Sequence, residues 1–400
     1  MQGSTGAEPV TLVRTGSPDA LSVALDATPL LGHPTGVGVF TRGALGALAA
    51  RPDLSVHAFA VSWRRRQGID QQLPASVVSR QRPMPARPLH AAWRHVDLPA
   101  IEWFIGPVDV VHGTNFVVPP TRRAGAVVSV HDLTPVHYPE LCNQATLAYP
   151  GLIARALRRG AWIHADSAFV AAEAVEAFSL DPARVRVVYP GLPEVPSADA
   201  DALAALTRRW PTLEGRRIIL AVGTAEPRKD LPGLVRAFDQ MAAEAKDLVL
   251  VLAGPPGWGE EALADAVDSA RAGDRIVRTG WVDDPTLGAL LASASVLAFP
   301  SRYEGFGFPP LQAMAAGVPV VATRAGSLPE VLGQAALLVD VGDGDALADA
   351  LGRALDDTDV RRRLIEAGPL QAARYRWDDC AEGLHALYRD VAAAGESRHA

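Results

Sequence analysis

The stretch between residues 298 and 330, AFPSRYEGFGFPPLQAMAAGVPVVATRAGSLPE, constrains the fold more than any other part of the chain. It overlaps an apolar run, Val296 to Pro300, that predicts a buried strand of a parallel sheet. A glycine-rich loop comes next, and Pro309 and Pro310 then fit the first turn of a helix, where a missing N–H costs little. Gly317 ends that helix, and the letters PVVA predict another buried strand. Strand, loop, helix and strand in this order predict a βαβ unit.

The same alternation of apolar strands with Ala/Leu-rich helical segments runs through the rest of the chain. With 400 residues, 48% of them apolar, the chain is long enough for two domains with sizeable cores. Proline and small polar residues between Pro193 and Asp201 predict a linker, and we expect the second domain to begin near Arg216. The other predicted strands are 21–25, 108–111, 126–130, 162–165, 185–189, 217–222, 248–252 and 276–281. An α/β fold with doubly wound parallel sheets follows.

Glu304 lies in the loop between the strand and the helix of the first segment. Free backbone N–H groups and the positive end of the following helix attract phosphate, while a carboxylate accepts hydrogen bonds from hydroxyls. A phosphorylated sugar carries both kinds of group. The alternative is that Glu304 is a solvated loop carboxylate.

A second candidate phosphate site follows the strand 217–222. Gly223 adjoins the strand end, and Arg228 and Lys229 precede the next predicted helix. Arg supplies a planar fork of donors and Lys a compact charge, and both stabilise a diphosphate that leaves with growing negative charge. Lys229 stands out because Lys246 is the only other lysine of the chain. The alternative is a solvated charged turn.

The N-terminal half brings a glycine loop and a histidine to predicted strand ends. Gly36 and Gly38 precede a helix expected from about Phe40, and Thr41 stands where a dinucleotide fingerprint needs its third glycine. A nicotinamide enzyme is therefore disfavoured, and a turn without ligand is the alternative. His131 follows the strand 126–130, where open α/β sheets bind ligands, with His112 as a secondary candidate. We also expect Ser167 to cap a helix.

Several of these motifs together resemble family 4 of the retaining GT-B glycosyltransferases. The donor signature of that family has two glutamates separated by seven residues, and Glu304 and Gln312 occupy these positions here. The runs VGTAEPRKDL and VVSVHDLTPVHYPE resemble two further motifs. The resemblance covers roughly residues 20–393 and implies two Rossmann-like domains that face a central cleft. It assigns 1–205 to the acceptor domain and 206–379 to the donor domain, with a final helix of about 380–395 packed back on the first domain and Trp377 in a structural role.

The resemblance also implies roles for individual residues. Glu304 and His131 would hold the donor sugar, and Arg228 and Lys229 would bind the donor phosphates. Gln312 replaces the glutamate that binds the nucleotide ribose, and although it can still accept a hydrogen bond it carries no charge. Asp132 would orient the loop or the histidine. The further donor-binding positions are Gly36, Gly38, Gly223, Thr224, Glu226, Val282, Gly305, Phe306, Gly307, Phe308 and Gln312.

The implied reaction is transfer of a sugar, with retention of configuration, from a nucleotide-diphosphate-sugar to a glycan, lipid-linked or small-molecule acceptor. Similarity of the EPRK and HD motifs to mannosyltransferase-like members suggests GDP-mannose as donor. We expect no cofactor and metal-independent chemistry, because Asp283 and Asp343 fit helix caps better than metal ligands. Two alternatives stay open: a nucleotide-sugar epimerase or hydrolase of the same fold, and a protein that binds sugar nucleotides without transferring them. Gln312 is the main argument for the latter.

Residues 60–96 differ from the rest because they hold seven arginines and two tryptophans but a single acidic residue, Asp70. We slightly favour a solvated, irregular segment, because no clean amphipathic helix is visible. The alternative is a contact with anionic lipid head groups or a phosphorylated acceptor. The net charge of -7 argues against a nucleic-acid partner. The arginines are Arg64, Arg65, Arg66, Arg80, Arg82, Arg87 and Arg94.

The remaining features bear on location. Cys142 and Cys380 are the only cysteines, which suits a reducing compartment. The first ten residues have neither a basic nor an apolar signal region, and we see no apolar run long enough to cross a bilayer. We therefore expect a cytoplasmic protein. If residues 60–96 contact anionic lipid head groups, the protein would be attached peripherally to the inner face of the plasma membrane.

Overall fold

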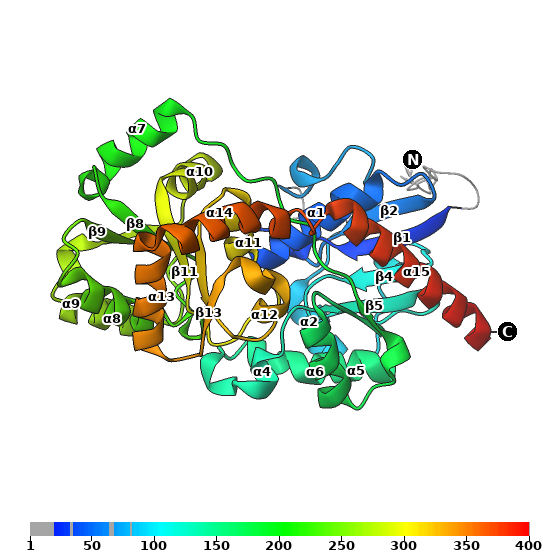
Figure 1. Ribbon diagram of the computed structural model, residues 1–400. Helices are drawn as coiled ribbons and strands as arrows, with labels where there is room; N and C mark the ends of the chain where they lie inside the picture. The colour runs from blue at the N-terminus through cyan, green and yellow to red at the C-terminus, as the bar shows by residue number, and fades with distance from the viewer. Residues whose placement is uncertain (1–19, 33–34, 64–67, 81, 400) are drawn as a thin grey trace, which may run out of the picture.

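The computed structural model of the chain describes residues 20–399, except 33–34, 64–67 and 81. Within this part of the chain the strands form two parallel sheets, which lie side by side in Figure 1. The first has the order β3-β2-β1-β4-β5-β6-β7 and the second the order β10-β9-β8-β11-β12-β13. In both sheets the order in which strands are added therefore reverses at a switch point. It lies between β1 and β4 in the first sheet and between β8 and β11 in the second. Ligands of open α/β sheets bind beyond the strand ends at such points.

Ten strands lie close to their predicted positions, whereas three, at 54–59, 78–79 and 337–339, were not predicted. In the first sheet they are β1 Leu21–Asp26, β2 Leu54–Phe59, β3 Val78–Ser79, β4 Val110–Gly113, β5 Gly125–Val130, β6 Trp162–Ala165 and β7 Val185–Val187. In the second they are β8 Arg217–Val222, β9 Leu248–Ala253, β10 Ile276–Gly280, β11 Ala294–Phe299, β12 Val320–Thr323 and β13 Leu337–Val339. Most of these strands are buried along nearly their whole length, as expected for sheets covered on both faces.

Helices cover both faces of each sheet. On the first sheet, α1 Gly36–Ala49 and α15 Trp377–His399 pack on one face, and α2 Ala86–His95, α5 Tyr149–Arg158 and α6 Ala168–Phe178 pack on the other. On the second sheet, α8 Leu231–Ala242 and α13 Gly344–Asp356 lie opposite α10 Asp284–Ser293 and α11 Phe308–Ala315. The other helices are α3 Glu102–Ile105, α4 Thr134–His137, α7 Ala200–Arg209, α9 Glu260–Ser269, α12 Leu328–Leu332 and α14 Thr358–Ala372. The α/β fold of two doubly wound domains is confirmed.

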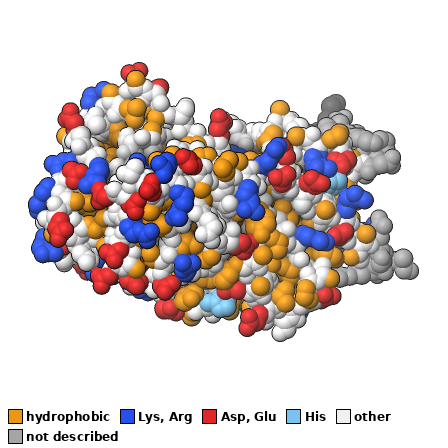
Figure 2. Space-filling model, in the orientation of Figure 1, with side chains coloured by type: hydrophobic (Ala, Val, Ile, Leu, Met, Phe, Trp, Pro, Cys, Tyr) orange, Lys and Arg blue, Asp and Glu red, His pale blue; other side chains and the backbone are white. Residues whose placement is uncertain are grey.

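The last helix links the two halves, because α15 leaves the second sheet and lies against α1 and β5 of the first (Figure 1). Trp377 opens this helix and fits between Gly43 and Gly191, where a β-carbon at either glycine would overlap the indole. The Tyr388 side chain further along α15 is fully buried. Over the half that contains the second sheet, Figure 2 shows Lys and Arg side chains interspersed with Asp and Glu.

Two local expectations were wrong. Helix α1 begins at Gly36 rather than near Phe40, so Gly36 and Gly38 form its first turn, capped by the Thr35 side chain, which accepts a hydrogen bond from Gly38 N at 3.3 Å. The 60–96 segment also contains an amphipathic helix, α2, whose Leu89 and Trp93 are buried. The pattern was hard to see because α2 has only ten residues and carries arginine and histidine beside its apolar positions. Arg64, Arg65 and Arg66 lie outside the described residues, as do the first ten residues of the chain.

Among the described helices, none has the length and apolar character that a bilayer crossing requires.

Candidate functional site

A cluster of opposite charges joins the strand ends at the switch point of the second sheet. Lys229 Nζ lies 2.5 Å from Glu304 Oε1, and Arg228 lies 2.9 Å from the same oxygen. Arg228 also contacts Glu226 at 2.8 Å. Because β8 and β11 are neighbours in the sheet, the loops that follow them bring these residues together from distant parts of the sequence. The two predicted phosphate ligands and the predicted sugar carboxylate therefore form one site.

Burial makes these charges depend on one another. Burial alone would raise the pKa of Glu304, but Arg228 and Lys229 outweigh it and lower that pKa to about 2. Burial opposes the charged form of Arg228, yet Glu304 and Glu226 raise its pKa. Burial and the nearby Arg228 lower the pKa of Lys229, because two cations share one carboxylate. Glu304 is therefore held as a carboxylate by two cations, one of which, Arg228, it shares with Glu226.

The glycine loop after Glu304 packs directly on the first domain. A β-carbon at Gly305 would overlap the carbonyl oxygen of His131, so only glycine allows this approach. Gly307 has φ +102° and precedes the first turn of α11. Phe306 is buried and Phe308 half-buried, and Phe308 packs against the cores of both sheets. The loop thus places the carboxyl ends of β5 and β11 against each other.

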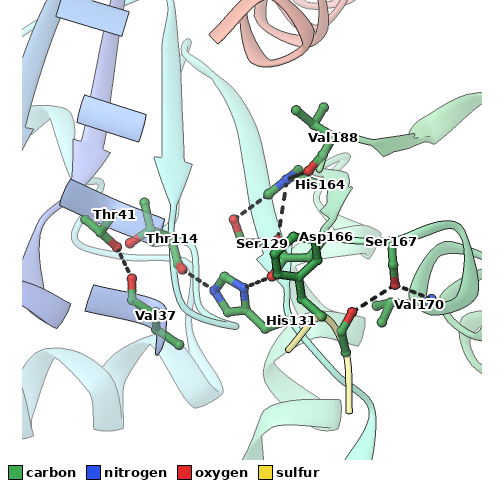
Figure 3. A network of polar contacts seen from close by, with 12 residues as sticks. Val37, Thr41, Thr114, Ser129, His131, His164, Asp166, Ser167, Val170 and Val188 are labelled. Carbon is green, nitrogen blue, oxygen red and sulfur yellow. Dashed lines mark hydrogen bonds and ion pairs between the residues drawn. The ribbon is translucent and has the colours of Figure 1, made fainter. Parts of the chain in front are cut away.

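His131 lies at the end of β5 with both ring nitrogens engaged (Figure 3). Its Nδ1 is 2.6 Å from Asp166 Oδ2, and its Nε2 is 2.7 Å from the carbonyl oxygen of Thr114. The rings of Phe40 and Phe116 each make a T-shaped contact with its ring, with a centroid distance of 5.4 Å. Asp132 accepts a hydrogen bond from Thr134 N at 3.0 Å and so orders the loop, while Asp166 orients the histidine.

Further contacts hold the two halves together around this site. Ser167 caps α6, as predicted, and also donates to the carbonyl oxygen of Gly305 at 2.9 Å. Glu330 accepts hydrogen bonds from the first two N–H groups of α6 at 2.8 and 2.9 Å. The Tyr303 hydroxyl donates a hydrogen bond to the Glu173 carboxylate and accepts one from Leu133 N at 3.1 Å. The site is closed in this structure, because polar groups of the two halves form hydrogen bonds with each other across it.

The other predicted donor-binding residues lie at various distances from the charge cluster. Gly223 has φ +153°, and a β-carbon there would lie 3.6 Å from the Lys229 side chain. Thr224 is half-buried beside Gly257, and Val282 packs on the core of the second sheet. A β-carbon at Gly36 would lie 3.8 Å from Phe308, so the N-termini of α1 and α11 adjoin.

Gln312 is half-buried on α11, and no side-chain hydrogen bond joins it to another described residue. His112 is fully buried away from the cluster, between Tyr388 and Ser129. Within the described part of the chain no group of three His, Cys, Asp or Glu side chains has the arrangement of a metal site. A hollow of about 410 Å³ lies where α15 begins, beside Tyr375 and Trp377.

The sequence pointed to Glu304, Lys229 and His131 but gave no role to Asp166, Tyr303, Glu173 or Glu330. Asp166 had a visible signal, because it follows the predicted strand 162–165 as His131 follows its own strand. The other three act across the interface between the halves. No local pattern announces such a contact, which depends on how the two sheets face each other.

Comparison with known proteins agrees with this architecture. The model of the family described as glycosyl transferases group 1 matches residues 205–371, and that described as glycosyltransferase family 4 matches residues 34–194. The O-antigen chain mannosyltransferase B of Escherichia coli is 32% identical over 275 residues, which cover 68% of this chain and 71% of that protein.

Solved structures share the fold at lower identity. Sucrose-phosphate synthase from Thermosynechococcus elongatus superposes with a TM-score of 0.70 at 23% identity, covering 94% of this chain and 100% of that one. The Anabaena protein HepE, solved with UDP and glucose, gives 0.68 at 17% identity with coverages of 94% and 100%. These similarities show the GT-B arrangement of two Rossmann-like domains. With the family matches and the E. coli relative, they establish that the chain is a family 4 glycosyltransferase, whose second half matches the description glycosyl transferases group 1.

Proposed function

We propose that this glycosyltransferase moves a sugar from a nucleotide-diphosphate-sugar to a hydroxyl acceptor with retention of configuration and without a metal ion. One observation carries the proposal: Arg228, Lys229 and Glu304 form a single buried charge cluster at the switch point of the second sheet. Two cations suit a diphosphate, and the carboxylate between them suits sugar hydroxyls. Together they match the two parts of the donor.

The donor would replace protein contacts that already exist. Its diphosphate would take over the cations that Glu304 now holds, and the freed carboxylate would accept hydrogen bonds from the sugar. Arg228 and Lys229 would then stabilise the negative charge that grows on the leaving diphosphate, which is the charge a metal ion neutralises in other enzymes. Lys229 is the stronger candidate for this exchange, because burial and Arg228 already work against its charged form.

We further propose a mannosyl donor, with GDP-mannose as the first choice. The support is the E. coli relative, whose name states that it transfers mannose. HepE was solved with UDP and glucose, so a UDP-sugar is the second donor to test. The acceptor would bind at the strand ends of the first sheet, in the half assigned to residues 1–205, and the donor in the half assigned to 206–379.

An epimerase or hydrolase on the same fold would consume the donor without an acceptor. A binding protein that has lost transfer would bind the donor and release nothing. A surface feature of the N-terminal half supports a lipid acceptor: Val96, Leu98 and Trp103 are 51, 55 and 56% exposed, and Arg87 and Arg94 of the preceding helix α2 are also exposed. Aromatic and aliphatic side chains among arginines suit an anionic membrane surface.

The membrane contact can be tested alone. Sedimentation with vesicles of phosphatidylglycerol should carry the protein down, and the triple variant Val96→Ser, Leu98→Ser, Trp103→Ser should stay in solution. Binding of neither protein would leave the solvated-segment interpretation of residues 60–96 standing.

The transfer reaction is tested with GDP- and UDP-sugars in EDTA, with and without simple glycoside acceptors. We expect release of nucleoside diphosphate that depends on the acceptor, and a product whose one-bond C1–H1 coupling assigns it the same anomeric configuration as the donor sugar. Release without acceptor would favour the hydrolase, an inverted product would contradict retention, and a requirement for added metal would contradict metal independence.

A further inference from the structure

Hydrogen-bond partners fix the protonation of three buried histidines at the ends of β4, β5 and β6. Asp166 and Ser129 place His131 and His164 within one polar network (Figure 3). The network continues from Ser129 to His112 and then to Tyr388 on α15. Each ring nitrogen of these histidines has a partner, and some partners can only accept. Counting which atoms must donate therefore assigns the protons without knowledge of the pH.

The chain through His164 and His112 has one consistent assignment with neutral rings. The carbonyl oxygen of Val188 can only accept, so His164 Nε2 donates to it at 3.0 Å. His164 Nδ1 then accepts from the Ser129 hydroxyl at 2.8 Å. Because the Ser129 hydroxyl already donates its only proton, its oxygen accepts from His112 Nε2 at 2.8 Å. His112 Nδ1 then accepts from the Tyr388 hydroxyl at 2.7 Å. Burial lowers the pKa of both rings and agrees with this assignment.

His131 differs because acceptors face both of its nitrogens. A neutral ring has one N–H, and its bare nitrogen would then meet a carboxylate or carbonyl oxygen at 2.6 or 2.7 Å. An imidazolium donates to both. The charged groups around the ring are Asp166 at the end of β6 and Asp132 next in the chain, with the neutral His112 and His164 on the sheet side. Burial lowers the pKa of His131, but Asp166 outweighs it and the pKa is raised.

We propose that Asp166 is a positioning residue of the transfer site, which keeps His131 as an imidazolium with both N–H groups turned into the protein. His131 then acts on the donor as a fixed positive charge at the end of β5, and neither gives nor takes a proton during transfer. The backbone of His131 contacts Gly305, next to Glu304, so this charge lies beside the loop assigned to the donor sugar. The role in transfer rests on the proposed function, whereas the protonation state does not.

Asp166 has few other partners, which makes its pairing with His131 specific. Its Oδ2 contacts His131, while its buried Oδ1 has no hydrogen bond within the described residues and lies 3.6 Å from His164 Nε2. Its side chain is 6% exposed, so water does little to support its charge. Removing the carboxylate should therefore destabilise the imidazolium more than any other single change.

The test is 15N NMR of histidine-labelled protein, with the His131 signals assigned by the His131→Gln variant. We expect both nitrogens of His131 to have the shifts of protonated nitrogens at pH 7, where an ordinary imidazole is mostly neutral. His112 and His164 should each show protonation at Nε2 alone and serve as internal controls. A single protonated nitrogen on His131 would overturn the proposal. This measurement needs no donor, so it stands or falls separately from the transfer activity.

Asp166→Asn supplies the functional arm, and Asp132→Asn is its matched control in NMR. The amide keeps the size of the side chain but removes the charge, so His131 should become titratable in the variant and lose its positive charge as the pH rises. Transfer by Asp166→Asn should then fall by about tenfold per pH unit above the new pKa, and this fall should begin at a lower pH than any such fall in the parent. In Asp132→Asn, His131 should keep both protons. An Asp166→Asn protein that is folded and equally protonated at His131 would contradict the role of Asp166.

Discussion

The two halves of the molecule hold positive charge at the site in opposite ways. In the C-terminal half, Arg228 and Lys229 are held by Glu304 and Glu226, anions that a ligand can replace. In the N-terminal half, His131 is tied to Asp166 and to a backbone carbonyl, which turn both its N–H groups away from any ligand. Both arrangements lie at carboxyl ends of parallel strands, so the same topology supports both.

This difference indicates a division of labour. Side chains that exchange partners can bind a diphosphate and release it after transfer, whereas a cation fixed by hydrogen bonds keeps its position throughout. The C-terminal cluster should therefore respond strongly to substitution of its cations. The N-terminal side should respond mainly to changes in protonation and in the contacts between the halves.

The largest effect should come from Lys229→Ala. Loss of the buried cation that we propose binds the diphosphate should reduce transfer by about 100- to 1,000-fold, within the range for removing one electrostatic contact to a developing anion. The matched control is Lys246→Ala, since Lys246 is the only other lysine and is exposed. Steady-state kinetics on both variants measure the loss of transfer. An equal loss in the two variants would contradict a role of the charge cluster in transfer.

Glu304 should give the C-terminal cluster a characteristic dependence on pH. Its pKa is about 2 in the folded protein against an ordinary 4.5, so the ion pairs stabilise the fold above pH 4.5 and this contribution disappears as the pH falls towards 2. The shift corresponds to about 3 kcal/mol at most. Urea unfolding from pH 7 to pH 3.5 should show the parent and Glu304→Gln converging below pH 4.5. A constant difference between them would mean that Glu304 is not held by its cations.

The contacts between the halves should contribute less. Glu330 accepts from two N–H groups at the start of α6, and Glu330→Gln retains only one acceptor oxygen. We expect a loss of about 1 kcal/mol in the free energy of unfolding, as for a helix cap. Glu176→Gln, an exposed change on the same helix, should alter it by less than about 0.5 kcal/mol. If Glu330→Gln unfolds like its control, the closed arrangement does not depend on this contact.

The smallest effect is expected at Gln312. Its side chain has no hydrogen bond to the described residues, and one contact to a ribose hydroxyl contributes about 1 kcal/mol. Gln312→Glu should therefore change nucleoside diphosphate affinity, measured by calorimetry, by no more than about fivefold, with transfer present in both proteins. Transfer by Gln312→Glu alone would instead support the view that the parent binds donors without turning them over.

The sequence predicted most strands because buried parallel strands are continuous apolar runs between glycines and polar residues. It also predicted Glu304, Lys229 and His131, which follow such strands directly. The start of α1 was misplaced, since glycines at its first turn resemble a loop. The partners of His131 and Tyr303 were not foreseen, because Asp166 and Glu173 reach them only through the order of β5 and β6 and the docking of the two halves.

The central claim is that a nucleoside diphosphate replaces Glu304 as the partner of Lys229. The most direct test is thermal unfolding in EDTA with GDP, UDP and their sugars, on the parent, Lys229→Ala and Lys246→Ala. A ligand that binds only the folded state must raise the unfolding temperature. We predict a rise with one nucleotide class in the parent and in Lys246→Ala, and none in Lys229→Ala. An equal rise in all three proteins, or no rise in any at millimolar ligand, would contradict the account.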